Sequence, residues 1–584
     1  MKQTLKPFRE DRGIASIPEI FFRSVKDFSS RQALSIFRDG IYSHLTYAEL
    51  GERVELLASG LRALGFSPGE KAAILGPNSP EWAMSYLSIL SAGGICVPVD
   101  YLLKRYEYYH IFKEAQVRWI FVASKFLKDL LEIDKELSLF KYLILFERPY
   151  EEVPKKVISL EDLLKKGQKK PQKPIFPDIE ELAVLIYTSG TTGKAKGVML
   201  THRSIVSDIA ACYQCLPFDK NDRFLSVLPM HHTFECTGGF LLPLYAGAHI
   251  TFARSLKSRD ILEDLKNSRT TIMLGVPLLF QKLYEGIERA IKKASFSKKV
   301  LIHSLLRLVS ISEKLRYEEK VAQIFFRRLR EQAGLSHLRF FVCGGAPLPP
   351  YLPKVFRRFG IKLIQGYGLT EASPILTVNP PEAPKDVSVG LPLPGVEIKI
   401  RKPNIDGVGE LCFRGPMIMQ GYYENPAATK EAFDEEGFLR TGDLGYVDKD
   451  GYVYVCGRTK NLIVTPTGKN VYPEEIEFEL NKSPYILESM VFGFPCEKGE
   501  EVWAVIVPDY EAIERDFLGK YLQKKDIEKI ISQEIKTYTA SLATYKHIKR
   551  FVIRDEELPK TTTRKIKRHL VIPKLIADLK KKIS

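Results

Sequence analysis

The stretch from Leu182 to Ser204, LAVLIYTSGTTGKAKGVMLTHRS, constrains the fold and the chemistry of this chain more than any other. Its apolar start, Leu182 to Tyr187, is typical of a buried strand, and hydroxyl-bearing residues, glycines and lysines follow it. Glycines let a backbone approach a phosphate closely, and hydroxyl and ammonium groups donate hydrogen bonds to it. The stretch therefore predicts a polyanion-binding loop made by Thr188, Ser189, Gly190, Thr191, Thr192, Gly193, Lys194 and Lys196.

The spacing of the glycines argues against a P-loop. That motif places four residues between a glycine and a Gly-Lys pair, and Ser or Thr follows the lysine. Here only Thr191 and Thr192 separate Gly190 from Gly193, and Ala195 follows Lys194. A flexible surface loop of similar composition is the other reading, and the strand in front of the loop argues against it.

Strand and helix patterns alternate along most of the chain, which at 584 residues is long enough for two or more domains. We expect an α/β fold with a large N-terminal domain of mixed, mainly parallel sheets flanked by helices. Such sheets bind ligands at the carboxyl ends of their strands. The strand patterns that carry this prediction lie at 71–75, 94–99, 119–122, 142–146, 182–187, 224–228, 271–274, 340–342 and 362–364.

Further boundaries follow from changes in composition. Residues 1–457 form the predicted large domain, with a β-rich subdomain of short strands at about 396–457. The major domain boundary is expected at about 458–461, and helix and strand patterns resume in 462–584, where we expect a smaller α+β domain. The basic run Lys165 to Pro174 indicates a solvated linker, and the basic residues from Pro559 to Ser584 indicate a solvated tail.

The chain carries 87 basic and 71 acidic residues, a formal net charge of +16. This charge suits nucleic acid, an anionic membrane surface or small polyanions. The basic segment 292–330 has apolar residues at roughly helical spacing, so it suits either a membrane surface or, as we prefer, a helical excursion packed on its own domain.

The N-terminus has no apolar core of a secretory signal, and eight cysteines do not make a disulfide framework in a chain of this length. We therefore expect a cytoplasmic protein, with the inner membrane face as a place for peripheral association. Cys212 and Cys215 have metal-site spacing, but without a second pair we read them as core-facing residues of one helix.

Four further motifs accompany the loop: GGAPL from Gly344, QGYGLTEA from Gln365, RTGDL from Arg440 and LPKTTTRKIKR from Leu558. In this order they closely resemble the adenylate-forming (AMP-binding) superfamily of acyl-CoA synthetases, luciferases and peptide-synthetase adenylation domains. The resemblance covers nearly the whole chain. GKNVYPEEIE, from Gly468, resembles bacterial long-chain fatty acyl-CoA synthetases in particular.

The resemblance implies roles on the ATP side of the reaction. The loop holds the β- and γ-phosphates, Glu371 binds Mg²⁺ and Thr370 touches the α-phosphate. Asp443 accepts both ribose hydroxyls, and Arg458 lies near the ribose and phosphate. The remaining ATP/AMP-binding residues, which shape the adenine slot, are Gly345, Ala346, Pro347, Gly366, Tyr367 and Gly368.

The same resemblance implies a second set of roles in the C-terminal domain. Lys565 swings in to bridge the incoming carboxylate and the α-phosphate. The C-terminal domain, 462–584, is mobile and rotates about Lys460, in a hinge at 458–461, between the two half-reactions. Gly468 and Lys469 line the coenzyme A channel. Arg564 departs from the pattern, because most members have a glycine there that eases an unusual turn.

The class of acid substrate is predicted from the stretch LPMHHTFECTGGFLLPLYAGAHI, Leu228 to Ile250. Ser226 to Ala248 has no aspartate and only Glu235, so an amino acid substrate would lack a reliable counterion for its ammonium group. The stretch instead resembles the fatty-acyl branch, which implies an acyl pocket bordered by His231, His232, Gly238 and Gly239.

Together these patterns predict an ATP- and Mg²⁺-dependent ligase that forms acyl-AMP and then a coenzyme A thioester of a medium- to long-chain fatty acid. The closest alternative transfers the acyl group to acyl carrier protein, whose acidic surface suits a basic partner. A non-catalytic adenylate or nucleic-acid binder is an alternative of another class, and intact Lys565 and Glu371 argue against it. Acyl chain length and oligomeric state stay open.

Overall fold

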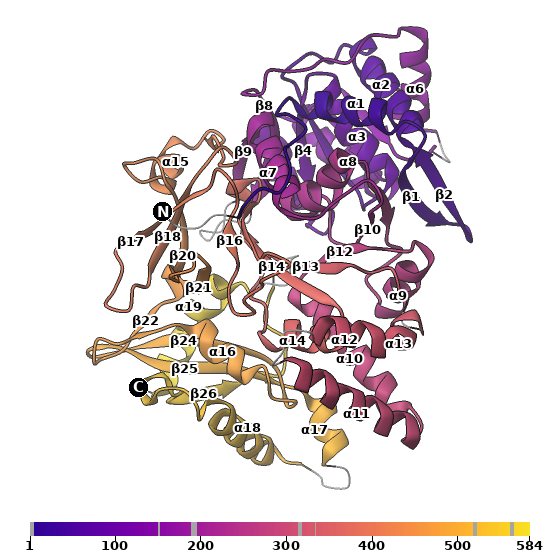
Figure 1. Ribbon diagram of the computed structural model, residues 1–584. Helices are drawn as coiled ribbons and strands as arrows, with labels where there is room; N and C mark the ends of the chain where they lie inside the picture. The colour runs from indigo at the N-terminus through magenta and orange to yellow at the C-terminus, as the bar shows by residue number, and fades with distance from the viewer. Residues whose placement is uncertain are drawn as a thin grey trace. The chain divides into compact units, whose positions relative to one another are not determined.

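The computed structural model describes residues 5–149, 152–188, 195–313, 318–332, 334–517, 522–560 and 566–583 (Figure 1). This described part of the chain divides into two compact units. The first comprises Met1–Glu397, Phe413–Leu439 and Lys449–Tyr452, and the second comprises Ile398–Cys412, Arg440–Asp448 and Val453–Ser584. The hinge expected at residues 458–461 stays a prediction.

One large sheet of the first unit is parallel in its interior, from β14 to β1, and has antiparallel strands at both edges. Strands β12, β13 and β10 supply one side of a hydrophobic core whose other side comes from helices α9 to α14. In spatial order the strands are β16 (Leu391–Pro392), β15 (Ile375–Val378), β14 (Lys362–Gly368), β13 (Phe340–Cys343), β12 (Ile272–Gly275), β10 (Arg223–Ser226), β11 (His249–Phe252), β1 (Gln32–Arg38) and β2 (Ile41–Thr46).

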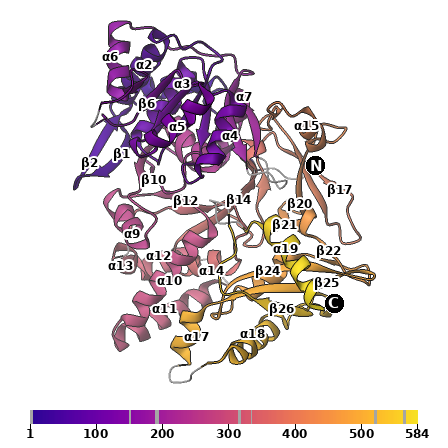
Figure 2. The same ribbon diagram turned by 180° about the vertical axis from the view of Figure 1, so that it is seen from behind.

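A second sheet in the same unit is parallel from β8 to β7, and β9 and β19 join it antiparallel. Helices α4 (Arg105–Ala115) and α5 (Leu127–Leu137) lie beside this sheet (Figure 2), and their apolar side chains join its hydrophobic core. In spatial order its strands are β19 (Gly421–Tyr422), β9 (Lys196–Thr201), β8 (Leu182–Thr188), β4 (Ile95–Val99), β3 (Lys71–Leu75), β5 (Trp119–Val122), β6 (Tyr142–Leu145) and β7 (Val157–Ser159).

The helices of the first unit begin where local sequence favours it. Thr46 and Glu49 form a reciprocal capping box at the start of α2, and Ser79 caps α3, which has Pro80 in its first turn. The helices are α1 (Ile17–Asp27), α2 (Tyr47–Ala63), α3 (Pro80–Ser91), α4 (Arg105–Ala115), η1 (Ser124–Phe126), α5 (Leu127–Leu137), α6 (Leu160–Lys169), α7 (His202–Cys215), η2 (Phe234–Leu241), α8 (Leu242–Ala246), α9 (Ser258–Asn267), α10 (Pro277–Lys293), α11 (Phe296–Glu313), α12 (Glu318–Phe325), α13 (Arg327–Gln332), α14 (Tyr351–Arg358), η3 (Thr370–Ala372) and α15 (Pro426–Ala432).

The predicted β-rich segment contains a four-stranded sheet of β17 (Glu397–Arg401), β18 (Gly409–Arg414), β20 (Leu439–Val447) and β21 (Val453–Arg458), in which β20 and β21 are antiparallel. Most residues of these four strands belong to the second unit. That unit continues through η4 (Thr459–Asn461), β22 (Ile463–Val464), β23 (Asn470–Val471), α16 (Pro473–Leu480), β24 (Ile486–Cys496), β25 (Gly499–Pro508), α17 (Tyr510–Asp516), α18 (Lys524–Thr539), η5 (Thr544–Lys546), β26 (Arg550–Ile553) and α19 (Arg568–Ile583). The expected fold class, α/β with a smaller α+β part, is confirmed.

Two expectations about basic segments are wrong. The expected linker at 165–174 is helical as far as Lys169, because Leu160, Leu163 and Gly167 of α6 are buried, and a Cβ on Gly167 would clash with the Leu56 carbonyl of α2. The expected solvated tail instead forms α19, since its apolar residues recur at helical spacing and Val571 is buried against β24 and β25.

The cysteine pair lies as expected, because Cys212 and Cys215 are both buried on α7. The apolar stretches around α3 and η2 to α8 are buried internal elements. Among the described residues, no helix combines the length and apolar character needed to cross a membrane.

Candidate active site

The predicted phosphate loop joins two antiparallel strands. Thr188, the last residue of β8, pairs with Lys196, the first of β9. Because β8 is parallel to β4, the loop leaves the sheet at a carboxyl strand end, where such sheets bind ligands. A P-loop leads from its strand into a helix, so the hairpin agrees with the exclusion of that motif. Residues 189–194, namely Ser189, Gly190, Thr191, Thr192, Gly193 and Lys194, lie outside the described residues.

The predicted magnesium ligand follows β14, the strand that carries the QGYG motif. Thr370 and Glu371 begin η3, and the Tyr422 hydroxyl donates a hydrogen bond of 2.8 Å to Glu371 Oε1. The Glu371 backbone carbonyl accepts a bond of 2.8 Å from the Met419 N–H. The Glu371 carboxylate offers the hard oxygen ligands that Mg²⁺ prefers.

The residues predicted for the adenine slot meet at the ends of two neighbouring parallel strands. Gly345, Ala346 and Pro347 follow β13, and Gly366, Tyr367 and Gly368 end β14. Gly345 has φ +78°, which a glycine adopts freely, and a Cβ on Gly368 would lie 1.7 Å from the Pro374 carbonyl oxygen. The structure thus brings the two motifs together, and their nucleotide contacts stay predictions.

The predicted ribose ligand lies in the second unit on β20. Arg458 Nε lies 2.6 Å from Asp443 Oδ1, and the two residues are paired across β20 and β21. The Asp443 N–H donates to Thr441 Oγ1 at 3.0 Å. These contacts fix a nearly buried carboxylate beside an exposed guanidinium, a pair with acceptor and donor capacity for a ribose phosphate.

The residues predicted to act in the second half-reaction lie on short turns of the second unit. Lys460 is in η4, where Asn461 Nδ2 donates to Glu474 Oε1 at 2.7 Å. Gly468 and Lys469 are exposed in the turn between β22 and β23, where Gly468 has φ +73°. The turn is closed by a bond of 2.8 Å from the Gly468 N–H to the Thr465 carbonyl.

Arg564 and Lys565 lie outside the described residues. The residues on either side of 561–565 are paired, because Lys560 forms an antiparallel bridge with Ile566. Lys560 also makes ion pairs with Glu488 and Glu557.

The two histidines of the predicted acyl pocket lie beside an acid that sequence reasoning missed. His231 Nε2 is 3.3 Å from Asp100 Oδ1, and the His231 and His232 ring centroids are 4.3 Å apart. The donor atoms of the three side chains lie within 4.8 Å of one another. Asp100 directly follows β4, and this position at a carboxyl strand end is the one signal by which the sequence could have marked it as a candidate.

The glycines of this segment are in close contact with other side chains. Gly238 and Gly239 lie in η2, a π-helix, a form that often occurs at functional sites. A Cβ on Gly238 would lie 2.9 Å from Leu274, and one on Gly239 would lie 2.6 Å from the Glu235 carboxyl group. Glu235 is fully buried, and burial raises its pKa to about 8.

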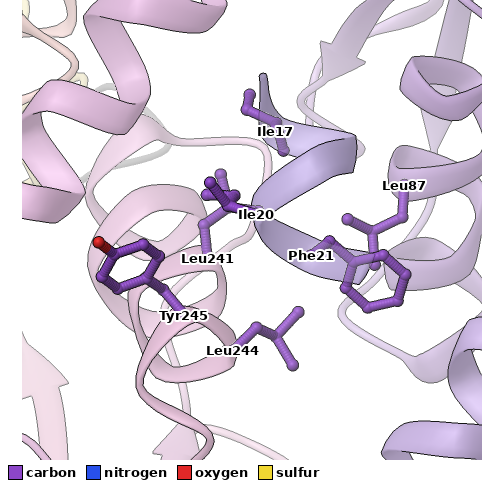
Figure 3. A pocket seen from close by; sticks show the side chains of 7 residues that line it. All are labelled: Ile17, Ile20, Phe21, Leu87, Leu241, Leu244 and Tyr245. Atoms are coloured by element: carbon purple, nitrogen blue, oxygen red, sulfur yellow. The ribbon is translucent and has the colours of Figure 1, made fainter. Parts of the chain in front are cut away.

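An apolar cavity beside this segment is too small for an acyl chain. Its volume is about 10 Å³, roughly that of one water molecule. Figure 3 shows side chains of α1, α3, η2 and α8 turned toward it: Ile17, Ile20, Phe21, Leu87, Leu241, Leu244 and Tyr245. We regard it as a packing gap behind the π-helix.

Family profiles match both parts of the chain. The profile of the AMP-binding enzyme family matches residues 21–423, and that of the AMP-binding enzyme C-terminal domain matches residues 475–565. The chain belongs to the AMP-binding enzyme family. The resemblance found in the motifs is thereby confirmed, and this AMP-binding enzyme is an adenylate-forming acid ligase by family.

Its relatives include ligases with different acyl acceptors. The chain is 27% identical to a chloroplastic long-chain-fatty-acid–[acyl-carrier-protein] ligase of Arabidopsis thaliana, over 96% of this chain and 85% of the relative. It is 30% identical to a long-chain-fatty-acid–CoA ligase of Gallus gallus, over 82% of this chain and 66% of the relative. Among solved structures, ATP-bound MatB from Rhodopseudomonas palustris matches with a TM-score of 0.75 at 25% identity, over 96% of this chain and 99% of that one.

Proposed function

We propose that this AMP-binding enzyme activates medium- to long-chain fatty acids with ATP, forming acyl-AMP and pyrophosphate, and then transfers the acyl group to coenzyme A. The observation that carries the proposal is the family match, combined with relatives that are fatty-acid ligases. The motifs for phosphate, metal and ribose are all present in the chain. Their presence argues against a binder without catalytic activity.

The first half-reaction needs two anions to approach while pyrophosphate leaves. The β8–β9 loop and Lys196 would grip the pyrophosphate, and Thr370 would contact the α-phosphate. Glu371 would hold Mg²⁺, which neutralises phosphate charge when bound. Asp443 and Arg458 would bind the ribose side, and Lys565 would bridge the carboxylate and the α-phosphate.

We propose that the fatty acid substrate enters beside His231 and η2. Glu235 is the acid that the segment from Ser226 to Ala248 offers, and its pKa of about 8 keeps it neutral at pH 7. The names of the relatives support a fatty acid over an amino acid as the substrate. For the second half-reaction we propose rotation about Lys460, with Gly468 and Lys469 at the coenzyme A channel.

The test is AMP production with carboxylic acids of graded length, run with coenzyme A and with acyl carrier protein as rival acceptors. We expect acid-dependent AMP release that is greatest for a medium or long chain, and a thioester with coenzyme A. Thioester on acyl carrier protein alone would establish the other acceptor, which the Arabidopsis relative's name supports. ATP binding without acid-dependent AMP release would overturn the proposal in favour of a non-catalytic binder.

We also propose that helices α10 to α13 associate with an anionic membrane. The inner face of α11 packs on the core through Ile302, Leu305 and the buried Val309. Its outer face carries apolar residues that water reaches, among them Phe296, 82% exposed, and Ile311, 65% exposed. α11 is a helix packed on its own unit, and apolar residues lie on both of its faces.

Basic side chains accompany this exposed apolar face. Lys292, Lys293, Arg307, Arg327 and Arg328 are all exposed on the same run of helices. Apolar side chains that enter the acyl boundary, beside cations that meet lipid phosphates, are the two components of interfacial binding. The net charge of +16 favours an anionic surface over a second copy of this chain.

A further inference from the structure

Tyr422 touches two of the residues placed on the ATP side of the reaction. Its hydroxyl donates to Glu371 Oε1 at 2.8 Å. The ammonium nitrogen of Lys196 lies 4.9 Å from the centroid of its ring, within the range of a cation–π contact. Tyr422 is therefore a bridge between the proposed metal ligand and a cation at the base of the phosphate loop.

The backbone of Tyr422 is fixed by the sheet and by α15. β19 pairs antiparallel with β9, so that Tyr422 lies opposite Val198. The Tyr422 N–H donates to Thr429 Oγ1 at 2.9 Å, and the Tyr423 N–H donates to the Gly197 carbonyl at 2.7 Å. A residue held on both sides in this way can hold its hydroxyl in one place.

The phenol is suited to orient a carboxylate. The Tyr422 hydroxyl is the donor in its bond to Glu371 Oε1, because a phenol keeps its proton at neutral pH. A carboxylate with one oxygen held by a donor presents its other oxygen in a defined direction. Hydrogen bonds of this kind orient metal ligands, and their loss typically lowers metal affinity by about 10–100-fold.

We propose that Tyr422 is a positioning residue that holds the Glu371 carboxylate ready for Mg²⁺ and keeps Lys196 beside the phosphate loop. The inference rests on the proposed function, because it takes Glu371 as the metal ligand of an ATP-using enzyme. It adds a residue that none of the five motifs contains. It also assigns a task to the turn between β18 and α15, which brings β19 onto the edge of the β8–β9 hairpin.

The test compares Tyr422→Phe with Tyr423→Phe in the full-length chain. The first substitution removes only the hydroxyl that donates to Glu371. The second removes the Tyr423 hydroxyl, which accepts a hydrogen bond from Lys71 at 3.0 Å. Mn²⁺ affinity is measured by electron paramagnetic resonance with saturating ATP and no fatty acid, so no turnover is needed. We expect about tenfold weaker Mn²⁺ binding for Tyr422→Phe and unchanged binding for Tyr423→Phe.

Glu371→Gln separates the inference from the proposed function. If Glu371→Gln weakens Mn²⁺ binding and Tyr422→Phe does not, the role of Tyr422 is overturned and that of Glu371 stands. If Glu371→Gln leaves Mn²⁺ affinity unchanged, the metal assignment itself falls.

Tyr422→Leu tests the contact with Lys196, because it removes the ring as well as the hydroxyl. Metal-free ATP affinity, measured with EDTA, should be unchanged in Tyr422→Phe and several-fold weaker in Tyr422→Leu. Equal metal-free affinity in both variants would overturn the Lys196 half of the proposal. Thermal unfolding of each variant identifies any loss of fold, and in that case Tyr422→Met, which also lacks a ring, replaces Tyr422→Leu.

Discussion

Arg458 Nε lies 2.6 Å from Asp443 Oδ1, and the two residues are paired across the neighbouring antiparallel strands β20 and β21. The Asp443 side chain is 5% exposed and the Arg458 side chain is 45% exposed. A nearly buried carboxylate is therefore held by a guanidinium that is accessible to water. A ribose that takes both carboxylate oxygens would have to share or replace this contact.

Asp443→Asn is therefore expected to raise the KM for ATP by about 10–100-fold, because hydrogen bonds to a charged acceptor are worth roughly 1.5–3 kcal/mol. Initial rates of pyrophosphate release at varied ATP measure it. Asp448→Asn is the matched control, since Asp448 accepts a bond from Tyr454 near the same sheet. An unchanged KM for ATP in Asp443→Asn would remove this acid from the ribose site.

Lys565→Ala should suppress acyl-AMP formation by orders of magnitude and spare thioester formation from supplied acyl-AMP. The expectation follows from a mobile cation that serves the first half-reaction alone. The two half-reactions are assayed separately, as pyrophosphate release and as thioester yield. Lys574→Ala, an exposed lysine of α19, is the control. Equal loss in both half-reactions would contradict the assignment.

The parts of the fold that the sequence predicted well are those set by local patterns. The apolar runs of β8, β13 and β14 mark buried parallel strands, and Thr46 with Glu49 marks the start of α2. α6 was misread as a linker because its lysines dominate the composition, whereas the burial of Gly167 against α2 depends on a distant part of the chain.

The site divides in the same way. The GGAP and QGYG motifs were located because GGAP directly follows the apolar run of β13 and QGYG directly follows the apolar start of β14, and parallel strands bring their carboxyl ends together. The contact between Tyr422 and Glu371 joins residues far apart in the sequence, and it depends on β19 pairing with β9. No local sequence pattern predicts the pairing of β19 with β9 or the proximity of Asp100 to His231.

The exposed apolar face of α11 predicts binding to vesicles of anionic phospholipid. Phe296→Ser and Ile311→Ser should each weaken binding by about tenfold or more, because burying such a side chain is worth roughly 1.5–3 kcal/mol. Added salt should weaken binding of the unaltered chain, and neutral vesicles should bind it less. Vesicle sedimentation measures both effects.

The matched control for this surface is Ile405→Ser, since Ile405 is an isoleucine of the second unit that is 100% exposed. Its vesicle binding should equal that of the unaltered chain. If Phe296→Ser and Ile311→Ser also bind equally well, α11 does not contact the membrane, and its outer face is an ordinary solvated surface.

Glu235 predicts a specific pH dependence of stability. Its pKa of about 8 in the folded chain exceeds its ordinary value of 4.5, because burial in η2 disfavours the charged form. The folded state therefore keeps a proton that the unfolded chain releases, so stability is greatest below about pH 4.5 for this group and falls as pH rises toward 8. Glu235→Gln is neutral at every pH, so its free energy of unfolding should rise relative to that of the unaltered chain across this window, by on the order of 5 kcal/mol in total.

The measurement is the unfolding temperature of both chains between pH 5 and 9. Glu52→Gln, at an exposed acid of α2, is the control and should follow the unaltered chain throughout. The difference between Glu235→Gln and the unaltered chain should grow with pH and level off above pH 8, where the buried carboxyl group is ionised. Parallel curves from pH 5 to 9 would mean that Glu235 is charged in the folded chain, and an amino acid's ammonium group would then have a counterion beside η2.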